Sequence, residues 1–536
     1  MPTIRFQLHN ELAAVAPAGW LGETFADYQK MIAHATFNPT KKMHFLPLRL
    51  VPSTISALRS RGFDVDVDKE LQGRLDYEAV ATKTFTAAAD ERAAHVDTQL
   101  RERGLALYPF QRVGIRWLAE RRTALLSDGM GLGKSMQALI AVPEGMGVLV
   151  VCPAIAKGVW ERETAKWRPD LQVSLLAGRG SFRWPDNGEL VVINYDILPA
   201  EVPPLPKTDS GFPRTIAVVA DEVHYVRGSK SQRATRFRVL AKKAQDAGGI
   251  VYLLTGTPML STQMDLWNVL RAGGLEREAF DKWPVFVDVM GGFEDWSGHL
   301  QWDLPKPESA ERLKRVMLRR RKAEVLPDLP RKRYETLVVA IDKKTQAACT
   351  KAVQELRKRG FPLVDDLPND AESLDCLSTL RKLLANAKTP ALLQVVHDLE
   401  EAKEPVVVFS AHRDPIDFLS KRPGWAPITG AVSAEQRSRT EADFQAGTLK
   451  GIAATIQAGG VAITLTYASR VLFLDRSWTP AENEQAEDRV CRIGQTRGVV
   501  ITTLVADHEI DRLVAKVLLR KQMMIAASVE KASSHG

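Results

Sequence analysis

The chain has 536 residues and a formal net charge of +8, with 45% hydrophobic and 26% charged residues, as in ordinary globular proteins of several domains. Its four cysteines lack metal-ligand spacing, and no apolar run is long enough to span a membrane, which argues against a zinc site, a disulfide framework and a membrane protein. The basic balance favours a polyanionic partner such as nucleic acid, and without a visible signal peptide we expect a protein of the cytoplasm or nucleoid.

The first residues, 1–103, are expected to form a small accessory domain with a linking helix. Within them, "STISALRSRGFDVDVDKEL" (53–71) predicts a helix, a glycine stop and a strand. The stretch "AAADERAAHVDTQLRERG" (87–104) predicts a charged helix that ends at Gly104.

Residues 104–270 predict an α/β lobe. Short apolar runs, which are typical of buried parallel strands, occur at 123–127, 147–153, 190–195, 215–221 and 250–256. Helix-like stretches lie between them, and this alternation predicts a parallel sheet with helices on both faces. Functional side chains are then expected at the carboxyl ends of the strands.

Residues 271–400 are polar and helical in character, and we expect them to connect this lobe to a second one. They contain the basic clusters "LRRRKAEV" (318–325) and "RKR" (331–333). A second alternating series fills residues 401–536, with apolar runs at 405–411, 426–430, 451–457, 470–475 and 499–505. The predicted fold class is therefore α/β, with two lobes, helical insertions and the small N-terminal domain.

The stretch "SDGMGLGKS" (127–135) follows an apolar run and precedes a helix-like one. The usual phosphate-loop pattern, G-x-x-x-x-G-K-[ST], would have a glycine where Asp128 stands, so the match is imperfect. The loop nevertheless has three alternating glycines, Gly129, Gly131 and Gly133. Glycines let backbone N–H groups approach phosphate oxygens, and a following helix adds its free N–H groups and dipole.

The side chains that end this loop are predicted to serve a nucleotide. Lys134 is placed to reach the β- and γ-phosphates, and the Ser135 hydroxyl is placed to ligate Mg²⁺. The alternative is a flexible turn beside a surface lysine.

An acidic pair follows the apolar run 215–221. Asp221 is placed to hold Mg²⁺, directly or through water, and Glu222 is placed to orient and deprotonate an attacking water. An isolated Asp-Glu pair is more often a solvated loop, but the position after a buried strand favours the catalytic interpretation.

These stretches together resemble superfamily-two helicases, and specifically the Swi/Snf family of DNA translocases. "DEVH" (221–224) is a variant of the DEAH box, and "DGMGLGKS" matches the family's phosphate loop. "LYPFQRVGIRWL" (107–118) looks like the adenine-reading segment, with Gln111 as the base-reading residue. "LLTGTPML" (253–260) resembles the motif that couples hydrolysis to lobe movement, and 317–333 looks like the arginine- and leucine-proline-rich element that follows it.

The second lobe carries the most specific likeness. Residues 464–506, together with the preceding "AGG" that ends at Gly460, are similar to the family's A-G-G-x-G-L-N-L, D-x-x-W-N-P and Q-A-x-D-R-x-x-R-I-G-Q signatures. Arg489 and Arg492 lie three apart, hence on one helix face, and can point across a cleft at a triphosphate as arginine fingers. Hydrolysis is then expected to require lobe closure. Gln485 and Gln495 match family positions near the cleft.

The resemblance covers about residues 105–525 and implies two tandem RecA-like lobes, ATP and Mg²⁺ as cofactors, and a monomeric motor of bacterial or viral type that translocates on double-stranded DNA. The contacts are expected to go to phosphates without regard to sequence. The candidate contacts are Lys157, Trp160, Asn194, Tyr195, Ser410, His412 and Gln457. Two alternatives stay open: a strand-separating DNA or RNA helicase, and an ATP-gated DNA-binding subunit of a replication, repair, restriction or defence assembly.

Overall fold

The computed structural model describes most of the chain. The described residues are 2–9, 12–19, 21–32, 35–39, 43–47, 51–73, 75–76, 100, 102–209, 211, 213–260, 262–296, 298–358, 371–459 and 463–529. The charged helix predicted over 87–104 therefore lies almost wholly outside them. No described helix has both the length and the apolar character that crossing a bilayer requires.

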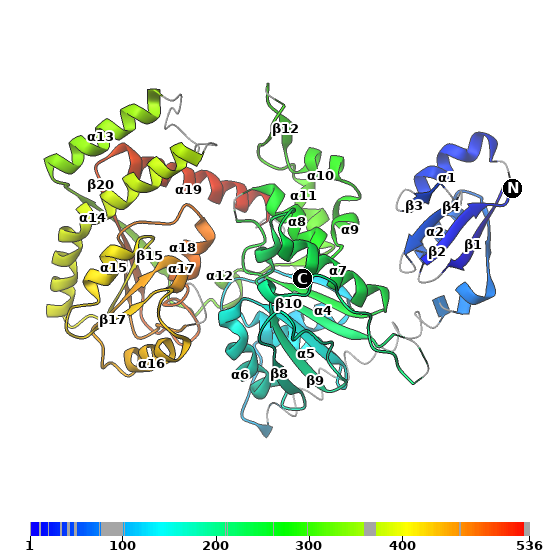
Figure 1. Ribbon diagram of the computed structural model, residues 1–536, viewed down its shortest axis with the longest axis horizontal. Coiled ribbons are helices and arrows are strands. Elements are labelled where there is room, and N and C mark those ends of the chain that lie inside the picture. The colour runs from blue at the N-terminus through cyan, green and yellow to red at the C-terminus, as the bar shows by residue number, and fades with distance from the viewer. Residues whose placement is uncertain are drawn as a thin grey trace.

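A small α/β unit forms from the N-terminal residues (blue in Figure 1). Its strands are ordered β3-β4-β2-β1-β5, with β1 antiparallel to β2 and parallel to β5. The elements are β1 (Thr3–His9), β2 (Leu12–Pro17), η1 (Gly22–Thr24), α1 (Phe25–Met31), β3 (Thr36–Asn38), β4 (Met43–Pro47), α2 (Val51–Ser60) and β5 (Asp64–Val67). The predicted helix, glycine stop and strand are confirmed by α2, Gly62 at φ 83° and β5.

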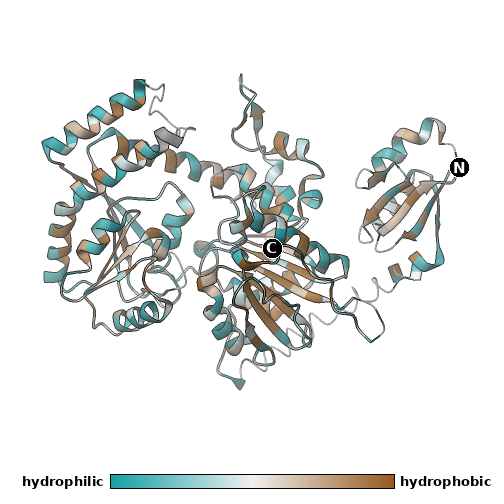
Figure 2. Ribbon diagram, in the orientation of Figure 1, coloured by the Kyte–Doolittle hydropathy of each residue, from teal (hydrophilic) through white to brown (hydrophobic). Residues whose placement is uncertain are grey.

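The first lobe is built on a seven-stranded parallel sheet in the order β14-β6-β11-β10-β7-β9-β8. Its strands are β6 (Thr123–Leu126), β7 (Gly147–Cys152), β8 (Gln172–Leu175), β9 (Glu189–Asn194), β10 (Ile216–Asp221), β11 (Ile250–Leu254) and β14 (Met317–Leu318). The strands β7, β9 and β11 are buried along their whole length, because helices cover both faces. The apolar strands are brown in Figure 2, and the predicted parallel sheet is confirmed.

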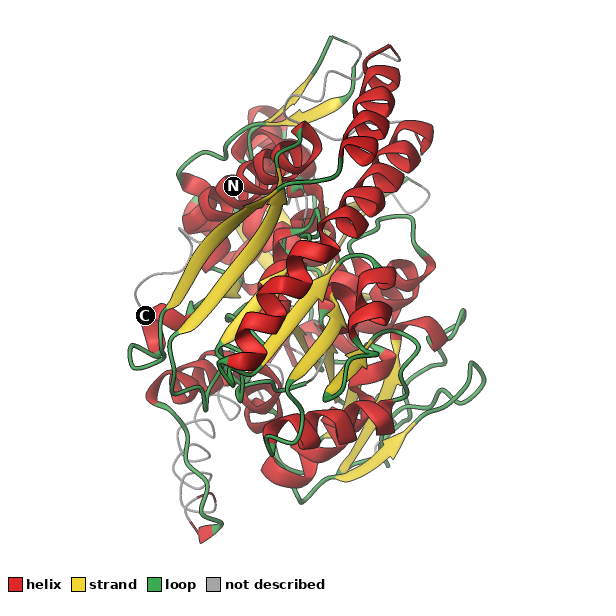
Figure 3. Cartoon of the chain, turned by 90° about the vertical axis from the view of Figure 1, so that its left-hand side faces the viewer, coloured by secondary structure: helices red, strands yellow, loops and turns green. Residues whose placement is uncertain are grey.

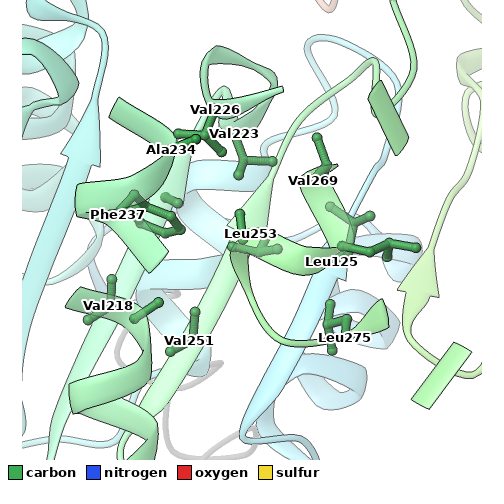
Figure 4. Close-up of a cluster of buried hydrophobic side chains, with 14 of the residues drawn as sticks. Leu125, Val218, Val223, Val226, Ala234, Phe237, Val251, Leu253, Val269 and Leu275 are labelled. Carbon is green, nitrogen blue, oxygen red and sulfur yellow. The ribbon is translucent and has the colours of Figure 1, made fainter. Parts of the chain in front are cut away.

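Two hydrophobic clusters pack against opposite faces of this sheet. Figure 4 shows part of one of them, where Phe237 and Val269 from two helices lie over Val218, Val251 and Leu253 of the strands. The helices and short 3₁₀ turns of this lobe are α4 (Pro109–Ala119), α5 (Lys134–Ala141), η3 (Ala154–Ala156), α6 (Lys157–Trp167), η4 (Tyr195–Ile197), η5 (Val223–Val226), α7 (Gln232–Asp246) and α8 (Gln263–Ala272).

Residues 271–400 contain mainly helices, but they also contribute strands to both lobes, which the sequence did not predict. Their first part packs on the core of lobe 1 and ends in β14, which extends the first sheet; it comprises α9 (Glu276–Phe280), α10 (Trp283–Val289), β12 (Gly292–Glu294), β13 (Leu300–Trp302) and α11 (Glu308–Lys314). Their last part joins lobe 2 through β15 (Lys332–Val339), which pairs along its length with β20 (Val499–Ala506). The pattern missed both strands because β14 has only two residues and β15 is largely exposed and polar.

The second lobe has a six-stranded parallel sheet in the order β15-β20-β19-β16-β18-β17. The helix α12 (Lys322–Val325) lies in the segment between β14 and β15. The other elements of lobe 2 are α13 (Lys343–Lys358), α14 (Ala371–Glu401), β16 (Val406–Ser410), α15 (Arg413–Leu419), β17 (Trp425–Ile428), α16 (Ala434–Gln445), β18 (Gly451–Thr455), α17 (Ile456–Gly459), β19 (Arg470–Phe473) and α18 (Pro480–Glu487). Figure 3 views the molecule from this side, with red helices in front of yellow strands. The second α/β lobe is thus confirmed.

The last helix, α19 (Glu509–Ser528), connects the lobes a second time. Its first turns pack Ile510 and Leu513 with α13 and α14 of lobe 2. Val529, directly after the helix, is buried in the core cluster of lobe 1. The red helix in Figure 1 follows this path from one lobe to the other. The two lobes are therefore held by the segment between β14 and β15 and by α19.

Candidate active site

A cleft with a cavity volume of 1090 Å³ lies between the lobes, at the carboxyl ends of the strands of lobe 1. Lobe 1 contributes the loop that starts α5 and the acidic pair that ends β10; lobe 2 contributes residues from α16 to α18 and beyond. The residues predicted from the sequence that line the cleft are Gly131, Gly133, Lys134, Ser135, Tyr195, Asp221, Glu222, Gln457, Gln485, Arg489 and Arg492. Groups that lie hundreds of residues apart in the sequence thus meet in one cavity.

The glycine-rich loop has the backbone geometry of an anion cradle. Gly131 and Gly133 adopt left-handed conformations, with φ of 76° and 80°, a region that residues with a Cβ atom rarely occupy. Lys134 begins α5, and its ammonium donates to the carbonyls of Asp128 (2.9 Å) and Gly129 (3.4 Å). Gly129 lies outside the left-handed region and lines a second cavity beside the cleft. The tight turn therefore depends on the second and third glycines.

Gln111 lies behind the loop and does not line the cleft. Its amide donates to the carbonyl of Leu132 (3.3 Å), and its oxygen accepts from the backbone N–H of Tyr108 (3.0 Å). A Cβ atom on Gly133 would stand 2.9 Å from the Gln111 amide nitrogen. In this structure Gln111 supports the loop, and base reading stays a prediction.

Asp221 is held from both sides by aromatic residues. The Trp160 indole Nε1 donates to its Oδ2 (2.8 Å), and the Tyr195 hydroxyl donates to its backbone carbonyl (2.8 Å). Burial, and then the neighbouring Glu222 carboxylate, raises the pKa of Asp221 to about 6, although Trp160 and Lys134 oppose the shift. A buried carboxylate with a raised pKa is stabilised in its ionised form when a cation binds next to it.

Glu222 has a strained backbone conformation. It has φ 49° and ψ 51°, a left-handed conformation that is uncommon for a residue with a side chain. Its Oε2 lies 3.2 Å from the His224 Nδ1, which is also 3.1 Å from the Thr255 hydroxyl. Burial alone would raise the pKa of Glu222, but His224, Lys134 and Arg489 together lower it. The residue is thus kept as a carboxylate, the form that accepts a proton from water.

The two predicted arginines face this group from lobe 2. They lie in the turns that follow α18, which ends at Glu487, so the prediction of one shared helix face is wrong. Arg492 donates to the Thr464 hydroxyl (3.0 Å) and to the carbonyl of Ile463 (3.3 Å). Burial, and then the proximity of Arg492, lowers the pKa of Arg489 to about 10, which still leaves it charged at neutral pH. The two guanidiniums repel each other, and an anion bound between them and the loop would offset this repulsion.

Two of the other second-lobe predictions have different outcomes. Gln485 lines the cleft, whereas Gln495 is buried away from it and donates to the carbonyls of Thr466, Ala468 and Val490. Gly460 lies outside the described residues.

A buried ion pair under the phosphate loop was not predicted. Asp128 is fully buried and accepts from Arg320 Nε (2.9 Å) and Nη2 (2.5 Å) and from the Gln137 amide (3.2 Å). The position that violates the usual loop pattern therefore anchors the loop to the segment after β14. The basic cluster 318–325 was visible in the sequence, but its partner was not.

Four of the predicted contacts to nucleic acid have buried side chains in this structure, and their contact with nucleic acid stays a prediction. Trp160 and Tyr195 are about 1% exposed and bond to Asp221, Asn194 is buried, and the Ser410 hydroxyl donates to Asp475 (2.5 Å). The aromatic rings of Trp160 and Tyr195 pack in the core clusters of lobe 1.

The remaining predicted contacts differ in how they are placed. The Lys157 ammonium donates to the carbonyl of Leu176 (2.6 Å), and the His412 ring is largely buried 3.7 Å from Asp475. Gln457 is exposed and lines the cleft. A group of cations that the sequence prediction missed lines the same cleft on lobe 1: Arg162, Arg179, Arg227, Arg233 and Arg236.

The residues fit a nucleotide with Mg²⁺. Mg²⁺ in such sites is held by one or two side chains together with substrate phosphates, since it keeps several of its waters. The Asp221 carboxylate and Ser135 hydroxyl line one cavity with Lys134. No cluster of three or more His, Cys, Asp or Glu side chains that could hold a metal alone occurs in the described part of the chain.

Comparison with known proteins gives a consistent result. The SNF2-related domain matches residues 110–389, just over half of the chain, and the helicase conserved C-terminal domain matches residues 387–494. The SWI/SNF-related matrix-associated actin-dependent regulator of chromatin subfamily A-like protein 1 of Xenopus tropicalis is 30% identical over 78% of this chain and 44% of its own length. The human DNA annealing helicase and endonuclease ZRANB3 is 28% identical over 79% of this chain and 40% of its own.

The chain spans less than half the length of both relatives. Among solved structures, the Sulfolobus solfataricus SWI2/SNF2 ATPase core in complex with dsDNA is 21% identical and has a TM-score of 0.36, over 80% of this chain and 94% of that one.

Proposed function

Because the chain belongs to the family defined by the SNF2-related domain, we propose that it is a DNA-stimulated ATP hydrolase that translocates on double-stranded DNA. One observation carries the proposal: Arg489 and Arg492 of lobe 2 line the same cavity as Lys134, Asp221 and Glu222 of lobe 1. An active site that is completed by two lobes couples chemistry to their relative movement.

The side chains divide the work of phosphoryl transfer. Lys134, released from its two loop carbonyls, binds the β- and γ-phosphates that the loop N–H groups cradle. Ser135 and Asp221 would hold Mg²⁺, which when bound neutralises charge on the phosphates. Glu222 orients the attacking water and accepts its proton.

The arginines stabilise the transition state from the other lobe. Guanidiniums that reach the transferring phosphoryl group contribute about 10³–10⁵ in rate. Because Arg489 and Arg492 belong to lobe 2, their contribution is available only when the lobes are closed on the nucleotide.

The DNA surface is proposed to include exposed arginines on lobe 1. Arg162, Arg179 and Arg227 are exposed and line the mouth of the cleft on neighbouring elements. Cations that contact phosphates give sequence-independent binding that weakens with salt. A relative whose name describes a DNA annealing helicase supports DNA as the partner.

The direct test is the rate of ATP hydrolysis by the full chain without nucleic acid and with duplex DNA, single-stranded DNA or RNA. We expect the largest stimulation with duplex DNA, and loss of hydrolysis in Lys134→Ala. Equal rates under all four conditions would overturn the translocase proposal, and a rate unchanged by Lys134→Ala would overturn the ATPase proposal.

Displacement of a triplex-forming strand from duplex DNA with ATP tests translocation itself. Displacement of a strand of the duplex would favour the strand-separating alternative. Arg227→Ala should weaken DNA binding and lower the slope of log affinity against log salt by about 0.9 if it contacts one phosphate.

A further inference from the structure

Two consecutive arginines after β14 hydrogen-bond to the phosphate loop and to the neighbouring strand end. The Arg319 guanidinium donates to the carbonyls of Ser127 (3.1 Å) and Gly256 (2.9 Å). Arg320 forms its bidentate pair with Asp128, and its own carbonyl accepts from the N–H of Gly129 (2.8 Å). These bonds fix residues 319–320 to lobe 1.

Two residues after Arg320, Lys322 of the same segment contacts lobe 2. The Lys322 ammonium donates to the carbonyl of Cys491 (2.8 Å) and lies 2.8 Å from the Asp488 carboxylate. The side chains of Lys322 and Asp488 are only 13% and 4% exposed. Asp488 directly precedes Arg489, and Cys491 directly precedes Arg492. One lysine therefore holds the residue before each of the two arginines.

Lys322 also lies against the phosphate loop itself. A Cβ atom placed on Gly131 would be 3.6 Å from the Lys322 Cε and 3.7 Å from the Arg492 Cβ. The lysine stem thus occupies the space between the loop and the arginine segment. Arg320 and Lys322 are separated by one residue, and two residues of chain span at most about 7 Å. The distance between the two anchors is correspondingly short.

We propose that Lys322 is a positioning residue that ties the arginine segment of lobe 2 to the phosphate loop of lobe 1. The proposal rests on the proposed ATPase function. Lys322 contacts neither nucleotide nor metal in this role. It sets the position from which Arg489 and Arg492 approach the transferring phosphoryl group.

The network offers a matched control. Lys332 lies 3.0 Å from Asp488 and 3.0 Å from Glu487, but it belongs to β15 and so joins two parts of lobe 2 only. Glu487 is held further by Arg476 (2.8 Å) and the Tyr334 hydroxyl (2.9 Å). Because Asp488 keeps Lys332 when Lys322 is replaced, Lys322→Met leaves no carboxylate unpaired in the interior.

The first experiment measures DNA-stimulated ATP hydrolysis and the binding of a fluorescent ADP analogue. Misplacing catalytic groups by about 1 Å can cost about 10²-fold in rate, so Lys322→Met should lower kcat by that order. ADP-analogue affinity should stay within about twofold, because ground-state binding uses lobe 1. Lys322→Arg should recover part of kcat. Lys332→Met should lower the melting temperature but change kcat less than Lys322→Met does, since the Lys332 cation does not bridge the lobes.

Epistasis identifies the group through which Lys322 acts. If it acts through the two arginines, Lys322→Met combined with Arg489→Ala/Arg492→Ala should have the kcat of Arg489→Ala/Arg492→Ala alone. A purely structural role predicts instead that the two losses multiply. Multiplying losses, or a kcat of Lys322→Met within twofold of the wild type, would overturn the proposal.

A second readout does not depend on hydrolysis. Nitroxide labels at Glu161→Cys in lobe 1 and Arg439→Cys in lobe 2, both exposed, report the interlobe distance by pulsed electron resonance. Cys376→Ser removes the only cysteine that is not buried. We expect a broader distance distribution in Lys322→Met than in Lys332→Met. Identical distributions would overturn the positioning role even if the wild-type chain hydrolysed no ATP, an outcome that would itself overturn only the proposed function.

Discussion

Replacing Asp128 with alanine tests whether the buried ion pair under the phosphate loop holds lobe 1 together. Asp128 is fully buried, and its Arg320 partner has a side chain that is 13% exposed. Without the carboxylate, the guanidinium keeps only its bonds to the Gln137 oxygen and the carbonyl of Phe110. Removing one partner of a buried pair leaves an uncompensated charge in the interior and costs about 3–5 kcal/mol.

This free energy corresponds to a measurable shift in melting temperature. Lobe 1 has roughly 200 residues, a size at which 1 kcal/mol shifts the midpoint by about 2–4 °C, so Asp128→Ala should lower it by about 6–20 °C. Differential scanning calorimetry of the full chain measures this shift. The double variant Asp128→Leu/Arg320→Met should recover stability, because replacing both charges by apolar groups removes the unpaired cation.

The control is an exposed ion pair in the same lobe. Arg116 and Glu120 form an i,i+4 pair at the end of α4 whose side chains are 62% and 39% exposed, and such pairs contribute about 0.3–0.5 kcal/mol. Glu120→Ala should therefore leave the midpoint nearly unchanged. If Asp128→Ala shifted it no more than Glu120→Ala, the buried pair would not stabilise the loop and the reasoning would be refuted.

Three further predictions concern the nucleotide side of the cleft. Gly133→Ala should lower nucleotide affinity, because the φ of 80° disfavours a side chain and the added Cβ would stand 2.9 Å from Gln111. Gly129→Ala brings no contact under 3.4 Å and should bind nucleotide as the wild type does in equilibrium titrations, so equal losses of affinity in the two variants would contradict the prediction. Since the pKa of Asp221 is raised to about 6, its ionised fraction should fall about fourfold between pH 7 and pH 5.5, and the Mg²⁺-dependent nucleotide affinity should fall with it. The control is Asp221→Asn, which carries no titrating group at this position. Parallel pH profiles of the wild type and this variant would refute the assignment. Trp160→Phe removes the hydrogen-bond donor to Asp221 and should weaken the Mg²⁺-dependent affinity for nucleotide about tenfold, which corresponds to the loss of one hydrogen bond to a charged group. Nucleotide affinity without Mg²⁺ should stay constant. An equal loss of affinity without Mg²⁺ would indicate a packing defect instead.

The sequence by itself determined the class of fold and the chemistry of the cleft. Buried parallel strands are apolar along their whole length because both faces are covered, so their runs stand out in the sequence. The groups of the cleft were equally visible, since a glycine turn with Lys134 and an acidic pair at a strand end are local arrangements. Their residue types follow from what phosphates and cations bind.

Only the tertiary structure decided which polar groups face the cleft and which support it. The burial of Trp160 and Tyr195 against Asp221, the partner of Asp128 and the two anchors of Lys322 all join residues that are tens to hundreds of positions apart. The strand β15 also escaped the pattern, because its backbone pairing with β20 does not require an apolar sequence. Local sequence carries propensity and spacing, whereas burial and the pairing of charges depend on which surfaces the packed chain brings into contact.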